Sequence, residues 1–153
     1  MNIATCDDDR KTCAFLEEKV RTIYQNAFIK SFYDADTLWR AAKKEPKRAP
    51  DILLLDIQMN CMNGMELARN LRGIGWQTVL IFITAYADYV FEAFDVGAFH
   101  YLVKPVSDKK LAEVLHKAED LLTQEKHEIK YADMDFDNTT DARRIAVKNA
   151  GVH

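Results

Sequence analysis

Short apolar runs alternate along this chain with longer segments in which apolar residues recur at every third or fourth position. Runs of the first kind are typical of strands buried on both faces of a sheet, and segments of the second kind are typical of helices that cover it. The pattern predicts strands at 2–6, 27–32, 51–55, 78–83 and 99–103.

A helical segment follows each predicted strand. The first has an apolar stripe of Cys13, Leu16, Val20 and Ile23, and the second begins near Asp34 or Asp36. The third spans Met65 to Arg72 and is stopped by Gly73 and Gly75, and the fourth spans Tyr86 to Val96 and is stopped by Gly97. The last helix begins at Ser107. Five strand–helix units in succession predict an α/β fold, with a parallel sheet and helices on both faces.

Length and composition fit one small domain with a short appendage. The 153 residues carry a net charge of -3, so there is no basic footprint for nucleic acid. The N-terminus lacks the features of a signal peptide, and no apolar run approaches about 18 residues, so we expect no membrane contact and a cytoplasmic protein. The three cysteines are an odd number without metal-ligand spacing and are expected to be reduced thiols.

Chemically active side chains come directly after four of the predicted strands. Asp7 and Asp8 follow the first, Asp56 follows the third, Thr84 ends the fourth and Lys104 follows the fifth. The carboxyl ends of parallel strands meet at one edge of the sheet, where ligands bind in this class of fold. Residues remote in the sequence are therefore expected to form one site. The adjacent Asp9 more simply begins the first helix.

Three neighbouring carboxylates raise one another's pKa unless a cation lies among them, and Mg²⁺ is the first candidate because it prefers oxygen ligands. The same set suits phosphoryl transfer. Asp56 is the candidate nucleophile, which forms an acyl phosphate, while Lys104 and Thr84 bind the remaining phosphoryl oxygens.

Five separated motifs carry a resemblance to a known family. They are Cys-Asp-Asp-Asp from Cys6, Leu-Leu-Leu-Asp-Ile-Gln-Met from Leu53, Asn-Gly-Met-Glu-Leu from Asn63, Phe-Ile-Thr-Ala-Tyr from Phe82 and Tyr-Leu-Val-Lys-Pro from Tyr101. In this order and spacing, residues 1–125 resemble the receiver domain of bacterial two-component response regulators. The resemblance implies a flavodoxin-like (CheY-like), doubly wound sheet of five strands in the order 2-1-3-4-5.

The resemblance also implies roles for individual residues. Asp56 would accept phosphate from the phosphohistidine of a sensor histidine kinase, and the domain would catalyse only its own phosphorylation and dephosphorylation. The Mg²⁺ ligands would be Asp56, Asp8, Asp7 through water and the backbone carbonyl of Gln58. Thr84 and Lys104 would contact the phosphoryl group, Tyr101 would be the switch aromatic, and the Lys104–Pro105 peptide would be cis.

Three other classes of protein compete with this interpretation. A haloacid-dehalogenase-type phosphatase also has a strand-end Asp nucleophile, but it needs a second Asp where this chain has Gln58. A flavodoxin-type electron carrier binds an anionic cofactor, which the acids at 7–9 would repel. An interaction module that works without phosphorylation would have lost some site residues, whereas this chain keeps them all.

Two further features of the sequence admit two interpretations each. Aromatic residues crowd the fourth helix and fifth strand, at Tyr86, Tyr89, Phe91, Phe94, Phe99 and Tyr101. They form either core or a partner surface, and the family resemblance favours a phosphorylation-dependent homodimer there. Cys61, near the site, is expected to be inert rather than a redox sensor, because a lone cysteine is usually unreactive unless its surroundings favour the thiolate.

The C-terminal part departs from the pattern of the domain. Residues 126–142 are expected to be the end of the last helix and an acidic linker, because their composition cannot form a core. Residues 143–153 resemble the opening strand of a LytTR-type (LytR/AlgR-like) DNA-binding domain. We therefore expect a piece of a longer regulator that contacts DNA only through a domain absent from this chain, with a disordered tail as the alternative.

Overall fold

The structure is a computed structural model that describes residues 1–137, with side chains described for residues 1–126. Strands and helices alternate throughout the described part. The strands are β1 (Asn2–Cys6), β2 (Phe28–Phe32), β3 (Ile52–Leu55), β4 (Val79–Thr84) and β5 (Ala98–Val103). The helices are α1 (Arg10–Ile23), α2 (Ala35–Lys44), α3 (Gly64–Gly73), α4 (Val90–Asp95) and α5 (Asp108–Asp137).

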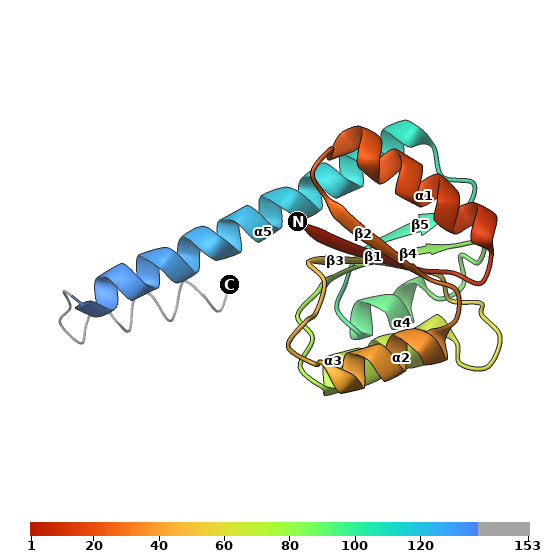
Figure 1. Cartoon of the computed structure of the whole chain (residues 1–153), viewed down its shortest axis with the longest axis horizontal. Coiled ribbons are helices and arrows are strands. Elements are labelled where there is room, and N and C mark those ends of the chain that lie inside the picture. Colours follow the sequence, from red (N-terminus) through yellow and green to blue (C-terminus); the bar gives the residue numbers. More distant parts are fainter. Residues whose placement is uncertain (138–153) are drawn as a thin grey trace. The chain divides into compact units, whose positions relative to one another are not determined.

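The five strands form one parallel sheet in the order β2-β1-β3-β4-β5, which confirms the predicted fold class and strand order. Helix α1 covers one face of the sheet, and α2, α3 and α4 cover the other (Figure 1). The order reverses between β1 and β3, so the crevice beyond their carboxyl ends is the expected place for ligand chemistry. Asp7 follows β1 there, and Asp56 follows β3.

Helix starts are fixed by short polar side chains. Asp9 caps α1, Asp34 caps α2 and Asn63 caps α3, and each accepts a hydrogen bond from a backbone N–H of the first turn. Ser107 does the same for the start of α5, as predicted. Tyr89, the residue before α4, makes no such side-chain bond.

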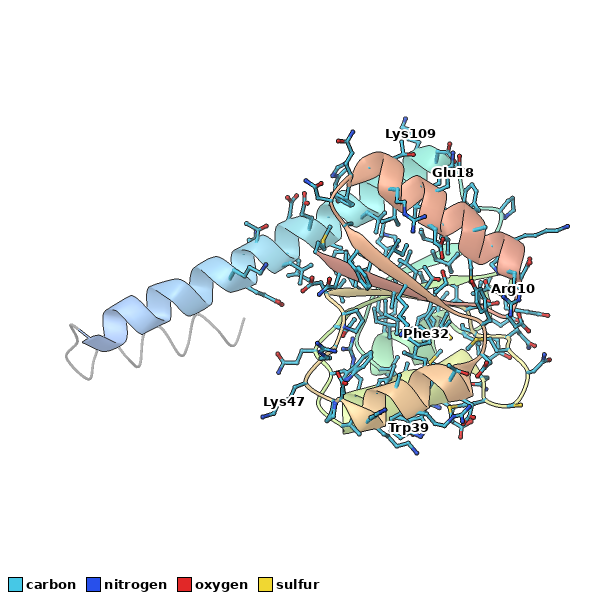
Figure 2. The ribbon with its side chains drawn as sticks, in the orientation of Figure 1. Arg10, Glu18, Phe32, Trp39, Lys47 and Lys109 are labelled. Carbon is cyan, nitrogen blue, oxygen red and sulfur yellow. The ribbon has the colours of Figure 1, made fainter. Side chains whose placement is uncertain are left out.

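The core between the sheet and α2, α3 and α4 is a continuous apolar cluster. Alternate residues of the central strands, such as Leu53, Leu55 and Phe82, pack there against side chains of the helices. Phe32, at the end of β2, lies between the sheet and α2, whereas Arg10 and Lys47 extend outward (Figure 2). All residues of β3 and β4 are buried, as expected for strands covered on both faces.

Arg72 joins the ends of three elements on this side of the sheet. Its half-buried guanidinium donates hydrogen bonds to the backbone carbonyls of Trp76, Thr78, Val96 and Gly97 at 2.8–3.0 Å. Burial lowers the pKa of Arg72, although a guanidinium stays charged. The side chain thus ties the end of α3 and the start of β4 to the end of α4.

Helix α4 differs from its predicted bounds by several residues. Helix α4 begins at Val90, four residues later than predicted, because 85–89 form a bend and turn without a capping side chain. Helix α5 continues to Asp137, so part of the predicted acidic linker is helical. The rest of that linker, 138–142, and the predicted domain fragment at 143–153 lie outside the described residues.

Residues 1–114 form one compact unit, which contains the whole sheet and the site described below. The remainder of α5 belongs to a second unit. Within the described residues, no helix is both long enough and apolar enough to cross a membrane.

Candidate functional site

Three carboxylates converge at the carboxyl ends of β1 and β3. One oxygen each of Asp7, Asp8 and Asp56 lies within 4.8 Å of the others, an arrangement that could hold a metal ion. Asp7 and Asp56 are buried, with 2% and 6% of their surface exposed, whereas Asp8 is open to solvent. The predicted acidic cluster is therefore present, and it faces solvent through Asp8.

Backbone amides fix the two buried carboxylates. Asp7 accepts a hydrogen bond from the amide of Asp9 at 2.8 Å through one oxygen, and Asp56 accepts one from the amide of Ile57 at 2.8 Å. The second oxygen of each carboxylate is directed to a side chain that directly follows β5. Because one oxygen is held by the main chain, each carboxylate keeps a defined orientation.

That side chain is Lys104, which the sequence placed at the same edge of the sheet. Its Nζ lies 2.8 Å from Asp7 Oδ2 and 3.4 Å from Asp56 Oδ2. Its backbone amide donates to the carbonyl of Thr84 at 2.8 Å, which fixes the end of β5 against the end of β4. The Lys104–Pro105 peptide is cis, as predicted.

The charges of the cluster are only partly balanced. Burial, and then the charge of Asp7, raise the pKa of Asp56 above its usual value, while Lys104 and the hydroxyl of Thr84 oppose the rise. Burial alone lowers the pKa of Lys104, but its two carboxylate partners outweigh this and raise it. One lysine therefore does not fully compensate the carboxylates.

The donor set fits Mg²⁺. Three carboxylates supply oxygen ligands of the kind that a hard divalent cation prefers, and the open side at Asp8 leaves room for water or a phosphoryl oxygen. The raised pKa of Asp56 indicates that additional positive charge would stabilise its ionised form. Gln58, the fourth predicted ligand, lies exposed in the loop two residues after Asp56.

Thr84 and Tyr101 are connected through one residue of the loop after β4. Thr84 is fully buried, and its hydroxyl accepts a hydrogen bond from the amide of Tyr86 at 3.4 Å. The carbonyl of the same Tyr86 accepts one from the Tyr101 hydroxyl. The Tyr101 ring is partly buried and packs near Phe82, with ring centroids 6.0 Å apart.

The loop between β3 and α3 depends on a glycine. A Cβ at Gly64 would lie 1.9 Å from the carbonyl oxygen of Asp56, a distance that no side chain can tolerate. The Gly64 amide donates to the carbonyl of Ile57 at 2.8 Å, which closes the loop onto the residues next to the nucleophile candidate. Cys61 lies exposed in this loop.

The predicted aromatic cluster divides between core and surface. Phe91 and Phe94 of α4 are 86% and 63% exposed, and Tyr86, in the loop before α4, is 43% exposed. Tyr89 and Tyr101 instead pack against the core cluster. We call Phe91 and Phe94 the α4 aromatic patch.

Three contributions to the site were not predicted. The sequence motifs gave no indication of the carboxylate-binding amides of Asp9 and Ile57, because main-chain donors have no signature in side-chain chemistry. The position of Tyr86 between Thr84 and Tyr101 was not predicted either, since Tyr86 contacts both residues only through its backbone N–H and C=O. The close approach at Gly64 did have a signal, the Asn63-Gly64 pair at the start of a helix.

Comparison with known proteins gives a family for most of the chain. Residues 3–116 match the response regulator receiver domain. The LytT sensory transduction protein of Bacillus cereus is 34% identical over 117 residues, which cover 74% of this chain and 46% of that protein. The positive alginate biosynthesis regulatory protein of Pseudomonas aeruginosa is 46% identical over 69 residues, or 45% of this chain and 28% of that protein. The predicted likeness to LytR/AlgR-like regulators is thereby confirmed, and the chain spans less than half the length of these relatives.

Solved structures agree on the fold. The response regulatory domain of the mrkE protein from Klebsiella pneumoniae has a TM-score of 0.74 at 25% identity, with 81% of this chain and 99% of that chain covered. The CheX-CheY-BeF3-Mg²⁺ complex from Borrelia burgdorferi contains a chain with a TM-score of 0.68 at 23% identity, with 76% of this chain and 87% of that chain covered.

Proposed function

Because the chain belongs to the response regulator receiver domain family, we propose that it accepts a phosphoryl group on Asp56 and thereby switches the surface around α4. The donor is the phosphohistidine of a sensor histidine kinase. One observation carries the proposal: a 6%-exposed carboxylate lies among two further acids and a lysine at the switch point of the sheet. Burying charged carboxylates so close together costs folding free energy, which is typical of sites where a function uses the charge.

Each residue of the site has a separate role in the phosphoryl transfer. An oxygen of the Asp56 carboxylate attacks phosphorus while the bond from phosphorus to the histidine nitrogen breaks, and the imidazole leaves. Lys104, now shared between Asp7 and Asp56, is within reach of an oxygen of the incoming group. The Thr84 hydroxyl is the second protein group that would bind it. These positive and hydrogen-bonding groups stabilise the charge that is redistributed in the transition state.

Asp7, Asp8, Asp56 and the carbonyl of Gln58 would hold Mg²⁺. The ion supplies positive charge that neutralises the phosphoryl oxygens next to the carboxylates. Asp7 and Asp8 thus bind the metal and not the substrate, while Lys104 remains available to the phosphoryl group. We infer the same residues for the reverse reaction, in which water removes the phosphoryl group.

Phosphorylation is tested by incubating the chain with acetyl phosphate and Mg²⁺ and measuring its intact mass. One phosphoryl group should be added, and site mapping should locate it on Asp56. Asp56→Asn should remain unlabelled, whereas Asp51→Asn should be labelled normally. Asp51 lies just before β3 and Asp56 just after it, so the control changes the same residue type at the opposite end of one strand. Equal labelling of wild type and Asp56→Asn would refute the assignment.

We infer that the switched surface is the α4 aromatic patch, and that it mediates a phosphorylation-dependent homodimer. Phe91 and Phe94 support this, because two largely exposed rings on one short helix are unusual for a surface that contacts only water. Phe91→Ser should abolish phosphorylation-dependent dimerisation in sedimentation experiments. Phe28→Ser, which removes a 66%-exposed ring from β2, should leave it intact.

The names of the relatives support a role in gene regulation. We propose that the receiver controls transcription through an attached DNA-binding domain of the LytTR type. A dimer of receivers would bring two such DNA-binding domains together. A longer chain carrying that domain should bind its target DNA more tightly after phosphorylation, and the Phe91→Ser version should lose this gain. An unchanged gain in Phe91→Ser would separate DNA binding from the dimer.

A further inference from the structure

A cavity of about 710 Å³ is lined by β1, β2 and α2 and extends to the end of the sheet opposite Asp56. Its wall includes Asn2 at the start of β1, Pro50 just before β3 and Trp76 just before β4. In a parallel sheet these are the amino ends of the strands, whereas the phosphorylation site lies at their carboxyl ends. The cavity is therefore a separate feature of the fold.

The interior of the cavity is apolar. Residues from β1, β2 and α2 line it, including Ala4, Phe32, Leu38 and Ala42, and the Trp76 indole closes another part of the wall. Trp76 is only 5% exposed, and its Nε1 has no hydrogen-bond partner in the part of the chain that the structure describes. The volume and the apolar lining are those of a site for a small molecule rather than for a macromolecule.

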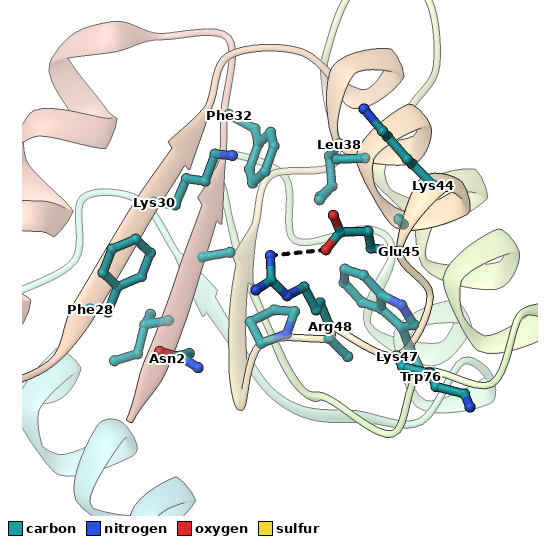
Figure 3. A pocket seen from close by; sticks show the side chains of 16 residues that line it. Asn2, Phe28, Lys30, Phe32, Leu38, Lys44, Glu45, Lys47, Arg48 and Trp76 are labelled. Carbon is teal, nitrogen blue, oxygen red and sulfur yellow. Dashed lines mark ion pairs between the residues drawn. The ribbon is translucent and has the colours of Figure 1, made fainter.

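The rim is cationic although the protein as a whole carries a net charge of -3. Four of the lining residues are cations, Lys30, Lys44, Lys47 and Arg48, and only Glu45 is an acid. Figure 3 shows Lys30 on the strand side, near Phe32, and Arg48 on the opposite side together with Glu45. Lys44 and Lys47 point away from the middle of the pocket in this view.

Arg48 and Glu45 form an ion pair at 3.0 Å across this part of the rim. Both side chains are largely open to solvent, so the pair itself contributes little to stability and can be exchanged for another partner. A ligand carboxylate at the rim would take the place of the Glu45 carboxylate on Arg48. The protein's own side chain thus indicates which chemical group the rim accepts.

We propose that this cavity binds a small apolar carboxylate, with the apolar body against Leu38, Ala42 and Trp76 and the carboxylate at Arg48. An apolar interior below a cationic rim complements a ligand of this class on both counts. A neutral apolar molecule would leave the rim cations without a new partner. A short, fully polar anion would leave the interior unfilled.

The probe is octanoate, and the readout is the fluorescence of Trp76 in a Trp39→Phe background, which removes the other tryptophan. We expect a saturable change with a dissociation constant on the order of 1 mM or below, as befits a ligand of about ten heavy atoms. Octanol and acetate should each bind at least about tenfold more weakly, because each lacks one of the two complementary parts. Octanol binding as tightly as octanoate, or no saturable change with octanoate, would overturn the proposal.

Variants at the rim give opposite expectations. Arg48→Gln should weaken octanoate binding at least about threefold, whereas Glu45→Gln should tighten it because Arg48 loses its competing partner.

A bulky side chain in the cavity should prevent binding. Ala41→Phe, at an exposed helix position that lines the cavity, should block it, and Ala14→Phe, at an exposed position of α1, is the matched control. Equal loss in both alanine variants, or weaker binding in Glu45→Gln, would contradict the assignment. Asp56→Asn should bind octanoate as wild type does, so the outcome is independent of phosphorylation.

Discussion

The hydroxyl of Tyr101 donates a hydrogen bond to the main-chain carbonyl of Tyr86. The amide of Tyr86 in turn donates to the hydroxyl of Thr84, so a single residue lies between Thr84 and Tyr101. If Thr84 shifts toward a phosphoryl group on Asp56, as proposed, we expect the Tyr86 amide and the carbonyl that accepts from Tyr101 to move with it. The connection needs no side chain of Tyr86, only its peptide groups.

This connection predicts that Thr84→Ala separates phosphorylation from its consequence. The variant should still be labelled by acetyl phosphate, but the strengthening of the dimer should fall at least about fivefold, which corresponds to the loss of one hydrogen bond of about 1 kcal/mol. Thr84→Ser keeps the hydroxyl and should behave as wild type. Sedimentation with and without acetyl phosphate measures the effect. A fully labelled Thr84→Ala with the wild-type dimer response would refute the connection.

Magnesium binding should depend on the exposed member of the acidic cluster. Asp8→Ala should lower the affinity at least about tenfold, since even residues that only support a metal ligand are worth that much. Asp36→Ala removes an exposed acid outside the cluster and should leave the affinity unchanged. Binding should also weaken as the pH falls through the raised pKa of Asp56, because a protonated carboxyl group is a poorer metal ligand. Isothermal titration provides the test, and equal affinities for wild type and Asp8→Ala would remove the metal assignment.

Asp56→Asn should stabilise the metal-free protein at neutral pH. The folded state raises the pKa of Asp56, so the ionised carboxylate is less stable there than in the unfolded chain, whose value is near 3.8. This penalty is complete above the raised pKa and disappears as the pH falls through it toward 3.8. The neutral Asn should therefore add roughly 1 kcal/mol at pH 7 and little near pH 4.

Urea unfolding in the presence of a chelator measures this difference. Asp51→Asn, at the other end of β3, is the control and should show no comparable gain. A loss of stability in Asp56→Asn at pH 7, or a gain that grows toward acid pH, would mean that Lys104 already compensates the carboxylate.

Two glycines of α3 should respond in opposite ways to the same substitution. Gly64→Ala places a Cβ 1.9 Å from the Asp56 carbonyl oxygen and should cost about 2 kcal/mol or more, because backbone must move. It should also slow phosphorylation, since the displaced backbone belongs to Asp56 itself. Gly73→Ala meets no atom within 4 Å and should be neutral or stabilise by about 0.4–1 kcal/mol. Thermal unfolding and labelling rates compare the two, and similar effects at both positions would contradict the close approach.

Most of the fold and the chemical groups of the site could be predicted from the sequence. The run Leu53 to Leu55 is apolar and ends in Asp56, so the strand, its burial and the position of the carboxylate follow from one pattern. Parallel strands then bring Asp7 and Lys104 to the same edge, because strand ends align whatever their separation in the sequence. These predictions rest on the spacing of apolar side chains, which the sequence shows directly, and on the rules by which parallel strands connect.

The errors lie where backbone groups decide the structure. The predicted start of α4 at Tyr86 was wrong because the apolar spacing continues through a segment whose peptide groups bond to Thr84 and Tyr101 instead of to a helix. A long last helix was predicted, but its continuation through 131–137 was not, because the apolar stripe fades there although no Gly or Pro interrupts 106–137. Arg72 could not be recognised in the sequence, since its partners are carbonyls of residues without a shared motif.

Arg72 donates hydrogen bonds to the carbonyls of Val96 and Gly97 and so holds the end of α4, whereas no side chain caps its start. The helix has six residues, its first turn lacks a capping side chain, and the exposed Arg69–Glu92 pair at 3.2 Å restrains it only weakly. We therefore expect a displacement of the loop at 85–89 to be felt most at the start of α4. Phe91 lies nearer to that start than Phe94, so the more exposed of the two rings is expected to move more.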